Sequence, residues 1–270
     1  MSARSVCQSV WLFLVMSCLS ATACAQQECQ HLTATGNPEY PPYLWRDPQN
    51  PRHLIGANAD LLKQAAKALG LEVDVLYVGP WSRAQEEVAS GRIDMMAGYF
   101  RTQAREQLMD FISPAFLYNA SVVWVRQGEG LHYSDWADLQ GLRGGTLVNN
   151  SHGQAFDDYA RAHLSLEAVP SATQAFEKLL RKRSDYVIFE HYPGLALART
   201  LGKAQQLQVL EPPISSEGLY MALSRKSACN MPQLREQLAR QIEALTAGAL
   251  PEQLVAHNLE RWQRQQQEDR

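Results

Sequence analysis

The sequence predicts an α/β fold with two lobes. Segments with the periodicity of strands and of helices alternate along the chain, which is typical of helices layered against a sheet. The chain has 270 residues, a length at which one hydrophobic core usually begins to divide into two. A short motif also occurs twice: Gly91-Arg92-Ile93-Asp94 and Lys182-Arg183-Ser184-Asp185 each place an aspartate before a buried strand. We therefore expect two similar lobes.

The first 25 residues are predicted to be a secretory signal peptide. Arg4 supplies the positive start, residues 10–19 are apolar, and Ala23-Cys24-Ala25 is a small-residue cleavage site. The apolar stretch is too short to span a bilayer, which needs about 20 residues. We expect cleavage after Ala25. Lipidation of Cys24 is the alternative, but Ala21 stands where lipoprotein signals usually place a large aliphatic residue.

The first half of the mature chain reads as a β-α-β-α-β run. Leu61, Leu62, Ala65 and Ala66 share one face of a helix that Gly70 ends, and Ser82 with Gln85 forms a capping box for the next helix. In order, we expect a strand at 32–35, a turn-rich loop at 36–51, a helix at 60–69, a strand at 73–77, a helix from 82 and a strand at 93–97.

The second half repeats this order of elements. Prolines are expected to interrupt the chain at Ser113-Pro114 and at Glu211-Pro212-Pro213. Between and after these breaks we expect strands at 120–125, 143–148, 186–189 and 219–224, helices opened by Ser151 and by Ser171, and two last helices starting near Pro232 and Pro251.

Composition and motifs exclude several classes of function. There are 25 basic and 28 acidic side chains, which gives a net charge of −3, so a nucleic-acid partner has no electrostatic support. Neither a G-x-G-x-x-G nor a Walker motif is present, and the seven histidines include no H-x-x-x-H pair. We expect no metal and no cofactor. The segment Asn149-Asn150-Ser151-His152-Gly153 resembles a hydrolase nucleophile elbow, but a capping role explains Ser151 better.

Two of the five cysteines, Cys29 and Cys229, remain after signal cleavage. An even pair in an exported protein indicates one disulfide, because the oxidising compartment preserves it. The alternative is two unrelated free thiols. Neither cysteine has the C-x-x-C spacing of a redox or zinc site.

Polar and aromatic residues gather at strand ends and helix starts, where open α/β sheets bind ligands. Their order resembles the extracellular solute-binding proteins of family 3, which serve polar amino acid ABC transporters and have the type 2 periplasmic-binding fold. The resemblance extends from about residue 32 to residue 259. It is carried by Tyr40-Pro41-Pro42-Tyr43, the segment 55–61, Pro80-Trp81, Gly91-Arg92-Ile93-Asp94, Thr102-x-x-Arg105 and Asp110-Phe111, and by Ser151 and Glu190.

The resemblance implies two lobes around a ligand cleft, each a mixed sheet flanked by helices. The chain crosses between the lobes at two hinges, expected near 119–125 and 212–218. Residues 26–120 and 217–270 then form lobe 1, and residues 121–216 form lobe 2, so both cysteines lie in lobe 1. We expect a monomer in the periplasm, with an inner-membrane ABC permease or sensor as its partner.

The resemblance also implies roles for individual residues. Arg105 holds the ligand α-carboxylate, since a guanidinium makes two parallel charge-assisted hydrogen bonds to it; a surface ion pair with Glu106 or Asp110 is the alternative. Glu190 stands where the family commonly has an aspartate that receives the ligand ammonium; a solvated acid at a strand end is the alternative. The implied ligand site further contains the Ser151 hydroxyl, the aromatic rings of Tyr40 and Trp81 unless these only pack in the core, and Gly98, Phe100 and His152.

One segment departs from the family pattern. Ala97-Gly98-Tyr99-Phe100-Arg101 stands where many members have small hydroxyl residues, so Phe100 fills volume and removes a polar contact. We therefore expect the ligand to be an aromatic or unusual amino acid, a small carboxylate or a peptide-like metabolite.

Three hypotheses for the function follow. The first is a binding protein, without enzyme activity, that closes around a small amino-acid-like or carboxylate ligand for ABC uptake or sensing. The second is a dehydratase of cyclohexadienyl acids such as prephenate, with Glu190 as a general acid beside His191. The third is a ligand-free accessory protein of a membrane sensor.

Overall fold

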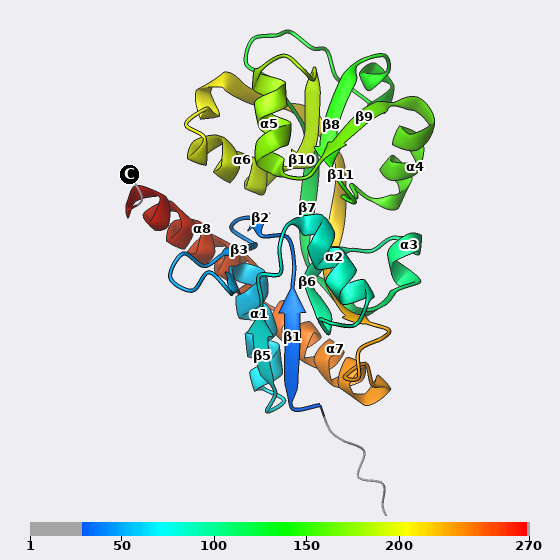
Figure 1. Cartoon of the computed structure of the whole chain (residues 1–270), viewed down its shortest axis with the longest axis vertical. Coiled ribbons are helices and arrows are strands. Elements are labelled where there is room, and N and C mark those ends of the chain that lie inside the picture. Colours follow the sequence, from blue (N-terminus) through cyan, green and yellow to red (C-terminus); the bar gives the residue numbers. More distant parts are fainter. Residues whose placement is uncertain (1–28, 269–270) are drawn as a thin grey trace, which may run out of the picture.

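Eight strands of one mixed sheet run through the centre of the molecule, in a computed structural model that describes residues 29–268 (Figure 1). The predicted signal peptide, with Cys24, lies outside these residues. In spatial order the strands are β5 (Glu72–Val75), β1 (His31–Thr35), β6 (Met95–Phe100), β11 (Leu207–Ser224), β7 (Met109–Arg126), β10 (Tyr186–Glu190), β8 (Arg143–Leu147) and β9 (Ser165–Val169). Among the described helices, none has the length and apolar character needed to cross a membrane.

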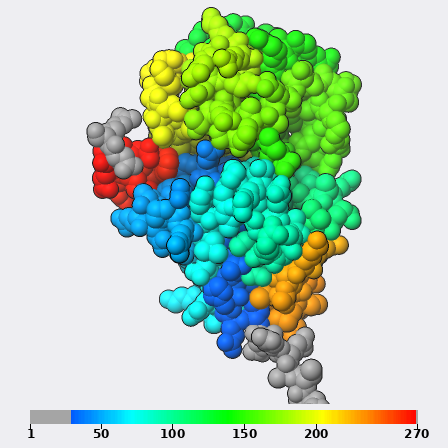
Figure 2. Space-filling view, in the orientation of Figure 1, coloured from blue at the N-terminus to red at the C-terminus, as the bar shows by residue number. Residues whose placement is uncertain are grey.

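The sheet divides into two lobes, as predicted. In the first lobe β1 pairs in parallel with β5 and β6, and in the second lobe β8 pairs in parallel with β9 and β10. The antiparallel strands β7 and β11, of 18 residues each, run from one lobe into the other. Figure 2 shows the second lobe, in green and yellow, resting on the blue, cyan and orange first lobe. The predicted residue limits of the lobes stay a prediction.

Helices cover both lobes (Figure 1). Those of the first lobe are α1 (Ala57–Lys67), α2 (Trp81–Ala89), α3 (Gln103–Glu106), α7 (Pro232–Thr246) and α8 (Leu250–Glu268). Those of the second lobe are the 3-10 turns η1 (Trp136–Leu139) and η2 (Ala204–Gln206), α4 (Gln154–His163), α5 (Ala172–Leu180) and α6 (His191–Thr200).

The position of α1 depends on the glycine that precedes it. Leu61, Leu62, Ala65 and Ala66 are buried against the sheet, as the periodicity predicts. Gly56 has φ 134°, and a Cβ atom there would lie 2.5 Å from the carbonyl oxygen of Tyr43. A side chain at this position is therefore excluded both by backbone conformation and by space.

A small second sheet lies inside the segment that was predicted to be a turn-rich loop. It consists of β2 (Glu39–Tyr40), β3 (Leu44–Arg46) and β4 (Leu54–Ile55), paired antiparallel. Strands of two or three residues are too short to show a period of two, so the sequence pattern could not reveal them.

The predicted chain breaks at the prolines are wrong, because β7 and β11 continue through them. The pairing of β7 with β11 shifts register between Leu210 and Ser215, which leaves Pro212 and Pro213 outside the ladder. It shifts again between Leu219 and Met221, opposite the part of β7 that contains Pro114. The prolines are tolerated because each lies in an irregularity where no ladder hydrogen bond is required of it.

Two of the predicted helix starts are also wrong. The N-cap of α2 is Pro80 and the N-cap of α4 is Gly153, and neither helix has a side-chain cap. Gln85 accepts a hydrogen bond from the Tyr99 hydroxyl at 2.6 Å, while Ser151 is engaged elsewhere, as described below. At α5 the prediction is confirmed, since the Ser171 hydroxyl accepts from the backbone N–H of Gln174.

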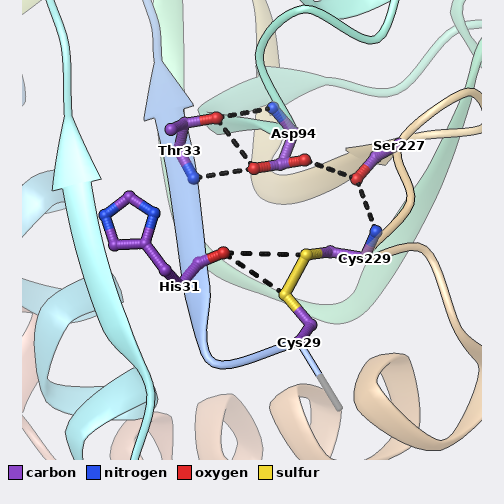
Figure 3. The surroundings of a disulfide bond; sticks show 6 residues. All are labelled: Cys29, His31, Thr33, Asp94, Ser227 and Cys229. Atoms are coloured by element: carbon purple, nitrogen blue, oxygen red, sulfur yellow. Dashed lines mark hydrogen bonds between the residues drawn. A yellow bond between two sulfur atoms is a disulfide. The ribbon is translucent and has the colours of Figure 1, made fainter. Parts of the chain in front are cut away.

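The predicted disulfide between Cys29 and Cys229 is present (Figure 3). It joins the start of β1 to the loop after β11, and thus two segments 200 residues apart in sequence. Beside it, the Asp94 carboxylate accepts hydrogen bonds from the backbone N–H and hydroxyl of Thr33, both at 2.8 Å, and from the Ser227 hydroxyl at 2.6 Å (Figure 3). This network and the disulfide fix the edge of the first lobe.

Candidate functional site

A small cavity lies between the lobes, next to the crossing strands. Its volume is about 20 Å³, which is room for about one water molecule. Six of the eight predicted ligand-site residues line it: Tyr40, Trp81, Gly98, Phe100, Arg105 and Glu190. The sequence reasoning thus selected residues that the fold brings together from β2, α2, β6, α3 and β10. The other two, Ser151 and His152, are not among the lining residues.

Arg105 is the cation of this cavity. It lies in α3, which the Thr102 side chain caps, and is 8% exposed. Its guanidinium donates to the carbonyl oxygens of Phe100 at 2.9 Å and, across the lobes, of Asn149 at 3.3 Å. Asn149 has φ 59°, a left-handed conformation that asparagine tolerates better than most residues.

The Arg105 side chain also lies over the Tyr99 ring, with its guanidinium carbon 3.8 Å from the ring centroid. No carboxylate of the described residues forms a salt bridge with it: Glu106 pairs with Arg101, and Asp110 pairs with Arg225 and Arg235. The alternative of a surface ion pair is therefore wrong. Burial lowers the pKa of Arg105, although Tyr99, Asp157 and Glu190 act in the opposite direction.

Glu190 is the acid of the cavity. It ends β10 and is 2% exposed, so the alternative of a solvated acid is wrong. Its Oε2 atom has no hydrogen-bond partner. Burial raises the pKa of Glu190 to about 7, while Asn150 and Arg105 lower it somewhat. The Asn150 amide is near enough to act on this pKa, but its nitrogen is not in hydrogen-bond geometry with any protein group.

Unsatisfied polar atoms converge on this cavity. Within the part of the chain that the structure describes, nine buried side-chain nitrogen or oxygen atoms have no hydrogen-bond partner. Four of them belong to residues that line the cavity: Asn58 Oδ1, Trp81 Nε1, Asn150 Nδ2 and Glu190 Oε2. Leaving one such group unpaired costs about 1–3 kcal/mol. The set offers two donors and two acceptors to whatever enters.

The backbone around Gly98 fixes the direction of the Asn58 amide. Asn58 Nδ2 donates to the carbonyl oxygen of Ala97 at 2.8 Å, which leaves Oδ1 as the free end. Gly98 has φ 110°, and a Cβ atom there would lie 2.2 Å from Asn58 Nδ2. Gly98 is thus required for the approach of Asn58 to the strand.

Aromatic side chains form two walls of the cavity. The hydroxyl of Tyr40 accepts from Asn119 Nδ2 at 2.6 Å, and its ring lies 5.2 Å from that of Tyr43. Trp81 meets Tyr99 edge to face, with ring centroids 5.5 Å apart. Tyr40 and Trp81 are therefore both cavity walls and parts of the packed interior.

Ser151 and His152 interact within the second lobe. The Ser151 hydroxyl donates to Asp157. The His152 ring shares hydrogen bonds with the hydroxyls of Ser121 at 3.1 Å and Thr146 at 2.9 Å. Burial, helped by Arg105, lowers the pKa of His152 to about 3, so this imidazole is neutral at physiological pH.

Sequence reasoning assigned no role to Asn58, Tyr99 or Asn150, although all three line the cavity. Asn58 lies in a segment that carried the family resemblance, Tyr99 lies in the segment that departs from it, and Asn150 directly precedes Ser151. A polar residue near the start of a predicted helix was the available signal for Asn58. The described residues contain no cluster of three or more histidine, cysteine or acidic side chains able to hold a metal ion, and the cavity lining includes no serine, cysteine or histidine nucleophile.

Comparisons with solved structures show what the chain resembles. An amino acid ABC transporter substrate-binding protein from Streptococcus pneumoniae, bound to L-arginine, superposes with a TM-score of 0.69 at 19% identity, covering 86% of this chain and 96% of that one. A mutant of the arginine-binding protein ArgBP from T. maritima gives a TM-score of 0.68 at 20% identity, covering 86% and 95%.

A histidine kinase sensor domain similar to periplasmic binding proteins gives a TM-score of 0.70 at 21% identity, covering 85% of this chain and 97% of that one. At such identities these similarities show a shared fold. No curated protein matches the sequence.

The family is established by the sequence itself. The sequence model of the bacterial extracellular solute-binding proteins, family 3, matches residues 32–262. This range includes both lobes and all of the residues that line the cavity. The chain belongs to the family 3 bacterial extracellular solute-binding proteins.

Proposed function

We propose that this solute-binding protein takes a small amino acid into the cavity between its lobes. Arg105 binds the ligand carboxylate, and Glu190 receives its ammonium group with help from Asn58 Oδ1. Trp81 and Asn150 donate further hydrogen bonds, and Tyr40 and Phe100 contact the apolar part of the ligand. Two solved proteins with this fold hold arginine, so L-arginine is the first candidate.

The observation that carries this proposal is the convergence of unsatisfied groups on one cavity. Two buried acceptors and two buried donors lack partners there, beside a guanidinium that has no carboxylate. A zwitterion supplies donors to the acceptors and acceptors to the donors. Each pairing relieves a desolvation cost of about 1–3 kcal/mol, so these groups favour a zwitterion once the lobes have made room for it.

Ligand entry requires the lobes to separate. A cavity of about 20 Å³ is too small for any amino acid. The two crossing strands lie side by side where Ser215, Ser216 and Glu217 pair with residues 119–121, and we place the hinge there. The ligand then bridges Arg105 of one lobe and Glu190 of the other, so its binding shifts the population toward closure.

We further propose that the protein works in the periplasm, as a monomer that delivers its ligand to an inner-membrane ABC permease. Its family comprises extracellular solute-binding proteins, and the Streptococcus pneumoniae protein that shares its fold is the substrate-binding protein of an amino acid ABC transporter. A sensing role is the second candidate, because a histidine kinase sensor domain shares the fold. The two roles are distinguished by the membrane protein that the mature chain captures. A permease would support transport, and a sensor kinase would support sensing.

Ligand-induced thermal stabilisation tests the proposed site. We expect L-arginine, or another member of a panel of amino acids and small carboxylates, to raise the melting temperature of the mature chain. Arg105→Ala abolishes this shift, because the carboxylate loses its charge-assisted hydrogen bonds. Arg101→Ala is the matched control: Arg101 is exposed and paired with Glu106, so its removal leaves the shift intact. An equal shift in Arg105→Ala and wild type would contradict the assignment.

A dehydratase reaction has weaker support. The raised pKa of Glu190 suits a general acid. His191, however, is absent from the cavity lining, and burial holds the pKa of His152 near 3. We expect no turnover of prephenate by the mature chain in an absorbance assay.

A further inference from the structure

The start of α4 carries a carboxylate of its own. Asp157 lies in the first turn of this helix, and both of its oxygens accept hydrogen bonds from the segment just before it. Oδ1 accepts from the backbone N–H of His152 at 2.9 Å, and Oδ2 accepts from the Ser151 hydroxyl. Helix starts attract anions because their N–H groups are free and the helix dipole is positive there. In this chain the donors just before the helix, the His152 N–H and the Ser151 hydroxyl, already have Asp157 as their anion.

The second-lobe side of the site is therefore acidic. Asp157 is close enough to Arg105 and to Glu217 to act on the pKa of each. Glu217 lies on β11, against Gly153 at the start of α4. Asp157 and Glu217 lie behind the cavity lining, whereas Glu190 belongs to it, and Arg105 is the single cation among the lining residues. His152 is neutral and adds no positive charge.

We propose that Asp157 is a specificity-determining residue, an internal anion that fills the anion-binding start of α4 and thereby excludes a second anionic group of the ligand. The inference rests on the proposed function. One ligand carboxylate has a partner in Arg105, whereas a second one would meet Asp157 and Glu217 with no cation left to pair with. The site consequently accepts amino acids whose side chain is cationic or neutral and rejects dicarboxylates.

Two probes of opposite side-chain charge test this selectivity. Binding of L-arginine and of L-glutamate is measured by calorimetry on the mature chain and on Asp157→Asn, which keeps the shape of the side chain and removes its charge. We expect wild type to favour L-arginine by at least about tenfold, since repulsion between like charges at a half-buried site is of this order. In Asp157→Asn we expect the ratio of the affinity for L-arginine to the affinity for L-glutamate to be smaller by about fivefold or more.

Asp158→Asn is the matched control. Asp158 is the next residue along α4, but it is exposed and bonds to Gln154 and Arg161, so its neutralisation leaves the ratio unchanged. A wild-type preference for L-glutamate, or equal ratios in wild type and Asp157→Asn, overturns the inference while the proposed function stands.

A second measurement needs no amino acid. Asp157→Ala frees the Ser151 hydroxyl and the His152 N–H, so sulfate at constant ionic strength raises the melting temperature of this variant more than that of wild type or Asp158→Ala. If sulfate raises the melting temperature of all three proteins equally, Asp157 does not occupy an anion-binding position at the start of α4, and the inference fails. If no amino acid binds but sulfate still singles out Asp157→Ala, the proposed function fails and the occupation of the helix start by Asp157 stands.

Discussion

Arg105 and Glu190 are both buried, yet they do not neutralise each other. Arg105 donates to two carbonyl oxygens, and Glu190 keeps one oxygen without any partner. A direct buried salt bridge would satisfy both groups but would also fill the place proposed for the ligand. Held apart, the two groups leave a gap that a zwitterion can bridge. Because Arg105 and Glu190 belong to different lobes, a ligand can bridge them only when the lobes are closed.

Replacement of Glu190 by glutamine tests how strongly this side chain binds a proton near neutral pH. Because folding raises the pKa of Glu190 from 4.5 to about 7, the folded protein binds a proton at pH values where the unfolded chain has released it. The stability of wild type relative to Glu190→Gln therefore falls as pH rises through this window, by roughly 2.5 kcal/mol between pH 5 and pH 8. Urea unfolding at several pH values measures the difference.

The control for this comparison is Glu260→Gln, since Glu260 is exposed on α8. Its stability should follow that of wild type at every pH. Parallel curves for wild type and Glu190→Gln would mean that Glu190 is ionised in the folded protein.

At the scale of elements, helix starts link the two lobes. The first N–H of α5, that of Ala172, donates to Glu39 Oε2 at 3.0 Å, and Glu39 belongs to β2 of the first lobe. The neighbouring cap, Ser171, lies in the same lobe as the helix. One helix start is thus held by one residue from each lobe. Gln154 at the start of α4 makes a similar link, since its Oε1 accepts from the backbone N–H of Gln103 at 3.1 Å.

Glu39→Ala should weaken closure without weakening either lobe. It removes an anion from a helix start, an interaction of about 0.3–1 kcal/mol, and this contact exists only while the lobes touch. We expect the affinity for L-arginine, or for whichever amino acid stabilises the chain, to fall about two- to fivefold. The radius of gyration of the free chain, measured by small-angle X-ray scattering, should rise.

Ser171→Ala provides the contrast. It removes a cap from the same helix and costs about 1 kcal/mol of unfolding free energy, but it leaves the contact between the lobes in place. Affinity should then stay within error of wild type. If both variants lose affinity equally, the effect comes from the stability of α5 and not from closure.

At the scale of the whole molecule, the sequence carried the alternation of strands and helices and the convergence of six cavity residues. It could not show that β7 and β11 run through their prolines, because the tolerance depends on register shifts between strands about 100 residues apart. Nor could it show that the Ser151 hydroxyl donates a hydrogen bond to Asp157 instead of capping α4. The pattern S-x-x-Q fits a capping box, but a carboxylate in the first turn competes for the same hydroxyl. A local sequence pattern indicates which hydrogen bonds a side chain is able to make, but the tertiary structure determines which partner is close enough.

We expect the disulfide to stabilise the first lobe and to leave the proposed movement between the lobes free. Cys29 precedes β1 and Cys229 lies in the loop after β11, so the bond joins two segments of the first lobe (Figure 3). The double variant Cys29→Ser/Cys229→Ser should lose about 2–5 kcal/mol of unfolding free energy, because the unfolded chain regains the freedom of a long loop. Urea unfolding measures this loss, and a reductant should bring wild type to the same midpoint while leaving the variant unchanged.

The ligand should still raise the melting temperature of the variant, although from a lower starting value than in wild type. Loss of that rise would mean that the disulfide positions the cavity as well as the edge of the lobe.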